Sequence, residues 1–423
     1  MNVLKKVKDF IGTRDSLEGF GIQNAAPKSQ QDMTELFARI YKNSGRLSLP
    51  AVISGELARL VTLEFKSQIT GSKRAEFLSC QYKRIIPKIR EITETACALG
   101  GVVLKPYVKD GKIDITCVTP DMFIPTDINP YGEITGGVFI DRLYKGGKVY
   151  TRLESHCFKG GAYIIENKCF ISDRIGNVGR EVPLVAVDAW RKIKPKVVVS
   201  ELTKPLFAYF KIPSGTLSLP LGEAVFSKAI PLITDAEEQY QRLLWEFESG
   251  ERALYIDDAA IRDDKSIPKR RLYRMINQEN LFTDWTPEIR EESIINGLDE
   301  IFRRIEFNSG LAYGTLSKIS DTDKTAEEVR ASKQRSYAKV TEIQKSLENA
   351  LIDLVYAMDE LCDLYFLSPK GEYDVNFEFD DSIIADRNRE FDERIALFEA
   401  GIISKDEMRE WYFGARKGEE NDD

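Results

Sequence analysis

Residues 325–366 read TAEEVRASKQRSYAKVTEIQKSLENALIDLVYAMDELCDLYF and contain neither proline nor glycine. Apolar side chains recur along this stretch in steps of three and four, which places them on one face of a helix: Val340, Ile343, Leu347, Leu351, Leu354, Met358, Leu361 and Tyr365. Thr325 and Glu328 have the capping-box spacing that begins a helix, and the turn sequence at 368–371 ends it. At a rise of about 1.5 Å per residue, the helix is roughly 60 Å long.

The apolar face of this helix has two possible partners. It packs either against the rest of the same chain or against a neighbouring copy in an assembly. Leu347, Leu354 and Leu361 are our candidates for a subunit interface, because only the second case makes their replacement by aspartate a change that breaks an assembly. The alternative for the whole segment is one arm of a two-helix coiled-coil hairpin in an ordinary protein.

Composition limits the class of protein. The chain has 423 residues, of which 43% are hydrophobic and 10% aromatic, so it can bury a large core in two or three domains. The six cysteines form no CxxC pair, which argues against a zinc ribbon or a redox dithiol and favours free thiols in a reducing cytoplasm. The basic segment at 1–10 is followed by no apolar run, and no stretch approaches a membrane span.

The net charge of -8 is unevenly distributed. Residues 372–423 hold 17 acidic and 7 basic residues, which accounts for the whole acidic excess of the chain. Such a segment repels nucleic acid at long range, and its last residues have the composition of a solvated acidic tail.

The period of the apolar pattern divides the chain into successive parts. Residues 30–100 are mainly helical by pattern, with Pro87 kinking or splitting the second helix. From Gly101 the period changes to two, and glycine turns at 110–111, 146–147 and 160–161 predict hairpins of an antiparallel β domain of roughly 90 residues.

The second half is predicted to be mostly helical. A helix is expected from about Leu221 to Gly250 and another from Pro287 to Phe307, flanking a compact excursion that contains strands. After the long helix we expect one strand at 375–379 and two short helices, the second capped by Ser404 with Glu407 three residues later.

No catalytic motif is present. The single histidine, His156, lies in a predicted strand, where a half-buried structural role is favoured over catalysis. The glycine-rich stretch at 310–315 has neither the spacing nor the lysine of a phosphate-binding loop. Residues 321–332 begin like a calcium loop but have Ala326 at the sixth position and Ser332 at the twelfth, so we predict no metal site, no cofactor and no enzymatic activity.

The order of these elements resembles that of the portal proteins of tailed bacteriophages, in particular siphophages of Gram-positive hosts. Five local marks carry the resemblance in the right order: Glu56-Leu57-Ala58-Arg59-Leu60-Val61 followed by Glu64; Gly100-Gly101-Val102-Val103-Leu104-Lys105-Pro106-Tyr107; Pro220-Leu221-Gly222-Glu223; Phe307-Asn308-Ser309-Gly310-Leu311; and Phe379-Asp380-Asp381-Ser382-Ile383-Ile384-Ala385-Asp386. Each is weak alone, and together they extend over most of the chain.

The resemblance implies an α+β portal fold that forms rings. Its implied parts are an N-terminal arm (1–29), a wing (30–220, with a helical part and then an antiparallel β domain at about 101–190), a stem helix (221–250), a clip (251–286), a second stem helix (287–307), a tunnel loop (308–324), a long wing helix (325–367) and a helical crown (368–423).

The resemblance also implies partners and a place of action. The expected ring, typically a dodecamer, lies at one capsid vertex of the virion after assembly in the host bacterial cytoplasm. Double-stranded DNA passes through it without sequence recognition during packaging and ejection. Further expected partners are the terminase large subunit, head-completion or adaptor proteins, and the major capsid and scaffold proteins, with no membrane.

Candidate contact residues follow from this assignment. A channel must not hold DNA tightly, and acidic residues outnumber basic ones in the two stem segments: Glu237, Glu238, Glu246, Glu248, Glu291 and Glu292 against Arg242, Arg290, Arg303 and Arg304. Lys318 and Lys324 in the tunnel loop are candidates for transient phosphate contact, with plain solvent exposure as the alternative. Lys269, Arg270 and Arg271 are candidates for partner docking on the clip.

Two other classes of protein remain as alternatives. One is a non-ring structural adaptor of the phage with a coiled-coil arm. The other is a carboxylate-based, metal-dependent nuclease of the packaging apparatus, which would need clustered acidic residues at strand ends. The strands at 101–170 carry few such residues.

Overall fold

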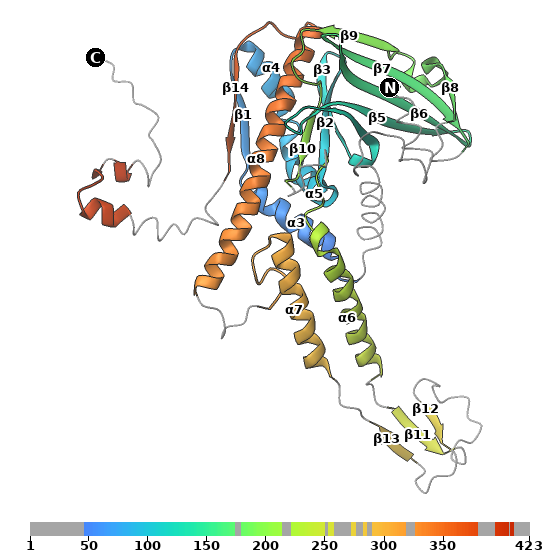
Figure 1. Ribbon diagram of the computed structural model, residues 1–423, viewed down its shortest axis with the longest axis vertical. Helices are drawn as coiled ribbons and strands as arrows, with labels where there is room; N and C mark the ends of the chain where they lie inside the picture. The colour runs from blue at the N-terminus through green and yellow to red at the C-terminus, as the bar shows by residue number, and fades with distance from the viewer. Residues whose placement is uncertain are drawn as a thin grey trace.

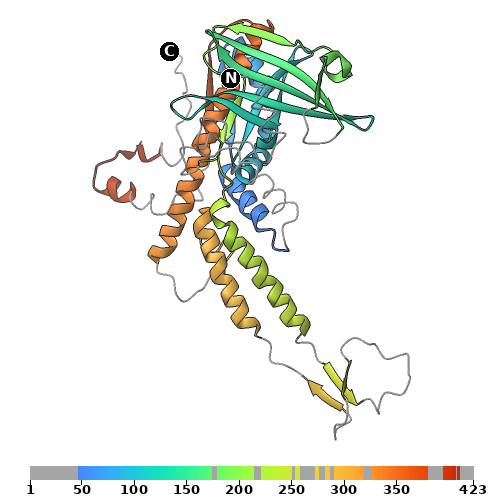
Figure 2. The ribbon, with the colours of Figure 1, turned by 45° about the vertical axis from the view of Figure 1, so that its right-hand side comes forward.

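A broad upper body of strands and helices carries two helices that descend side by side toward a small sheet (Figures 1 and 2). The computed structural model describes residues 46–173, 179–213, 221–249, 253–257, 272–275, 282–285, 290–318, 326–379, 394–405 and 407–409. Helices and strands are mixed, as the α+β prediction requires. Among these residues, no helix has the length and apolar character needed to cross a membrane.

The first part of the body is helical but contains one strand that the sequence pattern missed. Helix α3 (Leu49–Val61) packs against α5 (Ile89–Leu99), and Pro87 lies in the short 3₁₀ turn that separates α5 from α4 (Lys73–Tyr82), as predicted. Between α3 and α4, however, β1 (Lys66–Gly71) pairs antiparallel with β14 (Tyr373–Glu378). The helical prediction was wrong here, because this strand is specified by a partner about 300 residues away in the sequence.

Two antiparallel sheets form the rest of the upper body. One has the strand order β10-β2-β3, built from β2 (Gly101–Lys109), β3 (Lys112–Val118) and β10 (Ala208–Lys211). The other has the order β4-β5-β6-β7-β8 with β9 also paired to β7, and its strands are β4 (Phe123–Ile128), β5 (Ile134–Lys145), β6 (Lys148–Lys159), β7 (Ala162–Ser172), β8 (Arg180–Val182) and β9 (Lys196–Ser200). The β5-β6-β7 meander is joined by the two predicted diglycine turns, in which all four glycines have positive φ.

The two descending helices are α6 (Ile230–Ser249) and α7 (Glu291–Ser309), which we call the hairpin. They pack together through a narrow apolar stripe: Ile233, Ala236 and Leu243 on α6, and Leu298 and Ile305 on α7. Helix α6 begins nine residues later than the predicted Leu221. The reason is local packing. Gly222 lies so close to the backbone of Gly100 that an added Cβ would be 2.1 Å from the Gly100 carbonyl oxygen. The segment around Gly222 therefore packs against the upper body and is not part of the helix.

A three-stranded sheet lies at the far end of the hairpin (Figure 1). Its strands are β11 (Ala253–Asp257), β12 (Leu272–Met275) and β13 (Phe282–Trp285). The central strand, β11, pairs in parallel with β12 and antiparallel with β13. The predicted excursion between the two helices therefore contains strands, and the basic cluster Lys269, Arg270 and Arg271 lies outside the described residues.

The long helix is α8 (Ala326–Leu364), and it crosses the whole height of the upper body (Figure 1). It packs against β10, β2, α3 and α4. The predicted cap residue Thr325 and the side chain of Glu328 lie outside the described residues. The other predicted capping box is present, because the Glu407 N–H donates to Ser404 Oγ (3.2 Å) and the Ser404 N–H donates to Glu407 Oε2 (2.7 Å).

The apolar face of α8 is covered by the chain itself, which corrects our interface candidates. Leu347 and Leu354 are 0% exposed and Leu361 is 7% exposed, and all three belong to the main apolar core. A side chain without accessible surface in one copy cannot contact another copy. The three leucines are therefore core residues, and a subunit interface must use other surfaces.

Candidate functional site

A group of buried polar contacts lies where the hairpin meets the long helix. Helix α7 ends at Ser309, and Gly310 follows with a φ of 77°, the left-handed conformation that closes a helix without strain for glycine. The Leu311 N–H then bonds the Glu306 carbonyl oxygen (2.9 Å), and the Leu311 side chain is fully buried. The segment 311–318, which we call the junction loop, begins from this fixed point.

Glu306 holds the junction loop against α7. Its carboxylate is fully buried and accepts three hydrogen bonds: from the Leu316 N–H (2.5 Å), the Ser317 N–H (2.9 Å) and the Ser317 hydroxyl (2.8 Å). Bonds to a charged acceptor are stronger than those between neutral groups. One side chain of the helix thus fixes the backbone of the loop ten residues later in the sequence.

Asp299 fixes the end of the junction loop. Its Oδ1 accepts the backbone N–H of Lys318 (2.6 Å), and its Oδ2 pairs with Arg303 (3.2 Å) one turn later on α7. The Lys318 side chain remains exposed. Lys318, the described candidate for phosphate contact, therefore has a fixed backbone and a solvent-facing ammonium group, whereas Lys324 lies outside the described residues.

Helix α8 contacts the same junction through Arg335. The guanidinium carbon lies 4.3 Å from the centre of the Phe307 ring and 5.7 Å from that of Tyr313. Phe307 belongs to α7 and Tyr313 to the junction loop, so one arginine stacks on aromatic rings from both elements. The long helix, the hairpin and the loop are consequently joined at one place.

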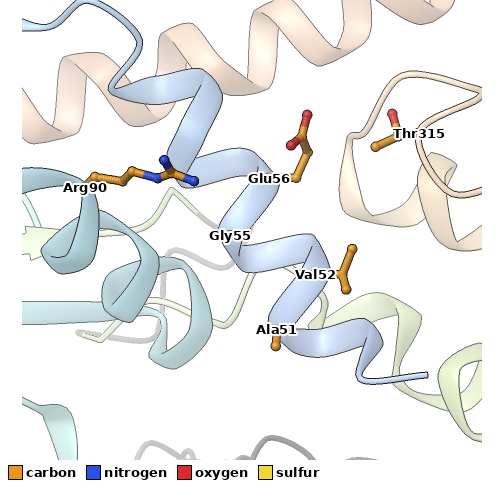
Figure 3. A pocket seen from close by; sticks show the side chains of 6 residues that line it. All are labelled: Ala51, Val52, Gly55, Glu56, Arg90 and Thr315. Atoms are coloured by element: carbon orange, nitrogen blue, oxygen red, sulfur yellow. The ribbon is translucent and has the colours of Figure 1, made fainter. Parts of the chain in front are cut away.

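An open groove of about 420 Å³ lies beside the junction loop (Figure 3). Ala51, Val52, Gly55 and Glu56 of α3 form one wall, Arg90 of α5 approaches from one side, and Thr315 of the junction loop faces them across the groove. The Glu56 carboxylate is bound by two guanidinium nitrogens of Arg59 (2.6 and 2.9 Å), which lowers its pKa. With its charge neutralised by Arg59, Glu56 does not present a free acid or base for catalysis.

His156 is a structural residue of the β domain, buried more deeply than predicted. It is 2% exposed, and its Nδ1 accepts from the Tyr163 hydroxyl (2.8 Å), which in turn accepts the Leu206 N–H (3.0 Å). Its Nε2 then donates to Glu154 (3.0 Å). Burial lowers the pKa of His156, so the ring is neutral at pH 7.

Glu154 is the centre of this buried network. It pairs with Lys105 (2.6 Å) and Arg152 (3.0 Å) as well as with His156. Burial alone would raise the pKa of Glu154, but these three partners hold it well below the usual range. Each of these residues is bound to a neighbour, and Lys105 of β2 and Glu154 of β6 join the two sheets of the upper body.

Sequence reasoning found the position of the junction loop but missed the residues that hold it. Asp299 and Glu306 were not among the residues that the sequence singled out, although Glu306 lies between Ile305 and Ser309, both buried. A carboxylate on the apolar side of a helix indicates a buried polar contact, and this was the signal that could have identified Glu306. Among the described residues, no group of three or more His, Cys, Asp or Glu side chains is arranged to bind a metal ion.

The structure predicts that Glu306→Ala releases the junction loop. Each bond to the charged carboxylate contributes about 1.5–3 kcal/mol, so amide exchange at Leu316 and Ser317 should accelerate at least about tenfold. Hydrogen exchange read by mass spectrometry measures this. Glu292→Ala, an exposed glutamate on the same helix, is the matched control and should leave the exchange unchanged. Equal protection in both variants would show that Glu306 does not hold the loop.

Comparison with known proteins gave one family. The model described as "Phage portal protein, SPP1 Gp6-like" matches residues 79–420. Among solved structures, a chain from "Neck of native GTA particle computed with C12 symmetry" is similar at 10% sequence identity with a TM-score of 0.43, covering 90% of this chain and 92% of that chain. No curated protein matched the sequence.

Proposed function

Since this chain belongs to the SPP1 Gp6-like family of phage portal proteins, we propose that it forms the ring channel at one capsid vertex through which phage DNA is packaged and ejected. The observation that carries the proposal is the combination of the family match with the hairpin. Two long helices project from a broad body, carry a small sheet at their tip and meet a fixed loop and a 39-residue helix at their root.

The parts of the proposed portal follow from this arrangement. The upper body at 46–213 with α8 is the wing, α6 and α7 are the stem, the sheet of β11, β12 and β13 belongs to the clip, and the residues after β14 belong to the crown. The clip is the proposed docking place for terminase and then for head-completion proteins, with Lys269, Arg270 and Arg271 as candidate contacts. Capsid and scaffold proteins are the proposed neighbours of the wing.

DNA would pass the stem and the junction loop without being held. Exposed glutamates on the hairpin repel phosphates, whereas Glu246 is buried and bound to Arg290, so it does not line a channel. Lys318 and Lys324 are the proposed sites of brief phosphate contact. A few exposed lysines repeated around a ring give weak, salt-dependent contacts that let DNA slide. A catalytic step is not part of the proposal.

Imaging of the purified full-length chain tests the proposed function. Negative-stain microscopy together with native mass spectrometry should show a closed ring, a dodecamer or a ring of similar number, with a central hole wide enough for duplex DNA. A monomer that cleaves DNA with divalent metal would favour the nuclease alternative. A monomer or dimer without a hole and without cleavage would favour the structural adaptor, and both results would refute the portal.

A further inference from the structure

The hairpin has an exposed face that none of the described residues covers. On α6, Glu238, Arg242 and Trp245 recur in steps of four and three on the side away from α7, and Trp245 is 62% exposed. A tryptophan is among the largest apolar side chains, and tryptophans are enriched at protein interfaces. The narrow α6-α7 stripe described above does not involve this face.

Helix α7 carries a stripe with the same spacing and complementary chemistry. Gly297, Glu300 and Arg304 recur in steps of three and four, and all three are exposed. A Cβ added to Gly297 would meet nothing within 4 Å. Glycine in a helix interior costs about 1 kcal/mol relative to alanine, and no contact within the described part of the chain requires a glycine there.

The two stripes match when α6 of one copy lies beside α7 of another. The bond between Glu246 and Arg290 sets the register of the antiparallel hairpin. From that register, a single shift of six residues along α7 brings three pairs together: Trp245 with Gly297, Arg242 with Glu300, and Glu238 with Arg304. One shift satisfies all three, with a large residue over the smallest one and two pairs of opposite charge.

The shift is compatible with a ring. Six residues correspond to about 9 Å along a helix. Long side chains lean toward the N-terminus of their own helix, which is up the hairpin on α6 and down it on α7, so their tips approach each other. An inclination of the hairpin to the ring axis supplies the part of the roughly 9 Å offset that the side chains do not span. Because the two faces differ, the contact is head-to-tail and can close into a ring.

We propose that this face of α6, defined by Glu238, Arg242 and Trp245, binds the Gly297, Glu300 and Arg304 face of α7 in a second copy of the chain. The proposal rests on the proposed portal function, since it names the surface by which neighbouring stems join. Glu300 and Arg304 already form an exposed pair within α7 (3.0 Å). In the assembly they extend into an alternating row of four charges with Arg242 and Glu238.

Charge reversal on one face at a time tests the proposal. One variant carries Glu238→Arg with Arg242→Glu, and a second carries Glu300→Arg with Arg304→Glu. Both preserve the net charge and the i,i+4 opposite-charge pair on their own helix. At low salt each alone should lose at least about tenfold in ring fraction by native mass spectrometry, because like charges meet at every interface. The variant with all four changes should form rings again.

Mixing gives a sharper result. Equal amounts of the two reversed variants should form rings in which the variants alternate, because every interface then joins matching faces. Rings of wild-type abundance in each reversed variant would overturn the proposal and leave the portal function intact. Failure of the wild-type chain to form rings would instead refute the portal function itself.

Cross-linking keeps the proposal testable if a reversed variant is poorly folded. Arg242→Cys with Glu300→Cys, in a chain whose exposed Cys80 and Cys117 are replaced by serine, should give a ladder at multiples of 48.1 kDa with a short bis-maleimide. A chain with only one of the two added cysteines should give no ladder, because the contact is head-to-tail and the four remaining native cysteines are buried. A double variant without a ladder, in a chain that forms rings, would contradict the stem contact.

Discussion

Leu354→Asp is expected to prevent the chain from folding, and not merely from assembling. Leu354 is 0% exposed and belongs to the main core, where α8 packs across the sheet of β2 and β10. Removing a buried leucine side chain costs about 2–5 kcal/mol, and an unpaired buried carboxylate adds a desolvation cost of several kcal/mol. Since a domain is stable by only about 5–15 kcal/mol, the variant should be largely unfolded in the absence of denaturant.

Ile352→Asp is the matched control. It lies on the same helix two residues away, it is 44% exposed, and its side chain has the same number of carbon atoms as leucine. We expect its free energy of unfolding to fall by less than about 1 kcal/mol. Urea unfolding followed by circular dichroism compares the two. A folded, monomeric Leu354→Asp chain would restore the original idea that α8 contacts a neighbouring copy.

The parts of the fold that were predicted correctly depend on local chemistry. Asp110, Gly111 and the two diglycine turns all have positive φ. Two consecutive residues of that kind form the hairpin turn whose twist matches the flanking strands. The long helix likewise follows from its own three-and-four spacing. These signals need no information from distant residues, so the sequence pattern was sufficient for them.

The parts that were missed depend on distant partners. β1 exists because β14 lies beside it, and an isolated stretch such as Gln68-Ile69-Thr70 carries too little alternation to indicate a strand. The residues that hold the junction loop were also invisible, since the role of Glu306 depends on the backbone direction of a loop ten residues later. For the same reason, the sequence left open whether the apolar face of α8 packs against its own chain or against a neighbouring copy.

Arg74→Met is expected to destabilise the chain by about 3–5 kcal/mol, the cost of breaking a buried ion pair by removing one partner. Arg74 on α4 is 1% exposed, and its guanidinium contacts the Asp363 carboxylate, the Asp359 carboxylate (3.5 Å) and the Pro369 carbonyl oxygen (2.9 Å). It thereby joins α4 to the end of α8 and to the segment that leads into β14. Without it, two carboxylates lose their buried partner.

The matched control is Arg84→Met, the same substitution at an arginine two residues after the end of α4. Arg84 pairs with Asp114, but its side chain is 57% exposed, and such a pair contributes about 0–1 kcal/mol. Thermal and urea unfolding should therefore separate the two variants clearly. Amide exchange adds a local test: β1 and β14 should lose protection in Arg74→Met, because their two-stranded sheet depends on the end of α8 being held beside α4. Equal stability of the two variants would mean that apolar packing alone fixes the end of α8, and that the buried arginine is compensated elsewhere.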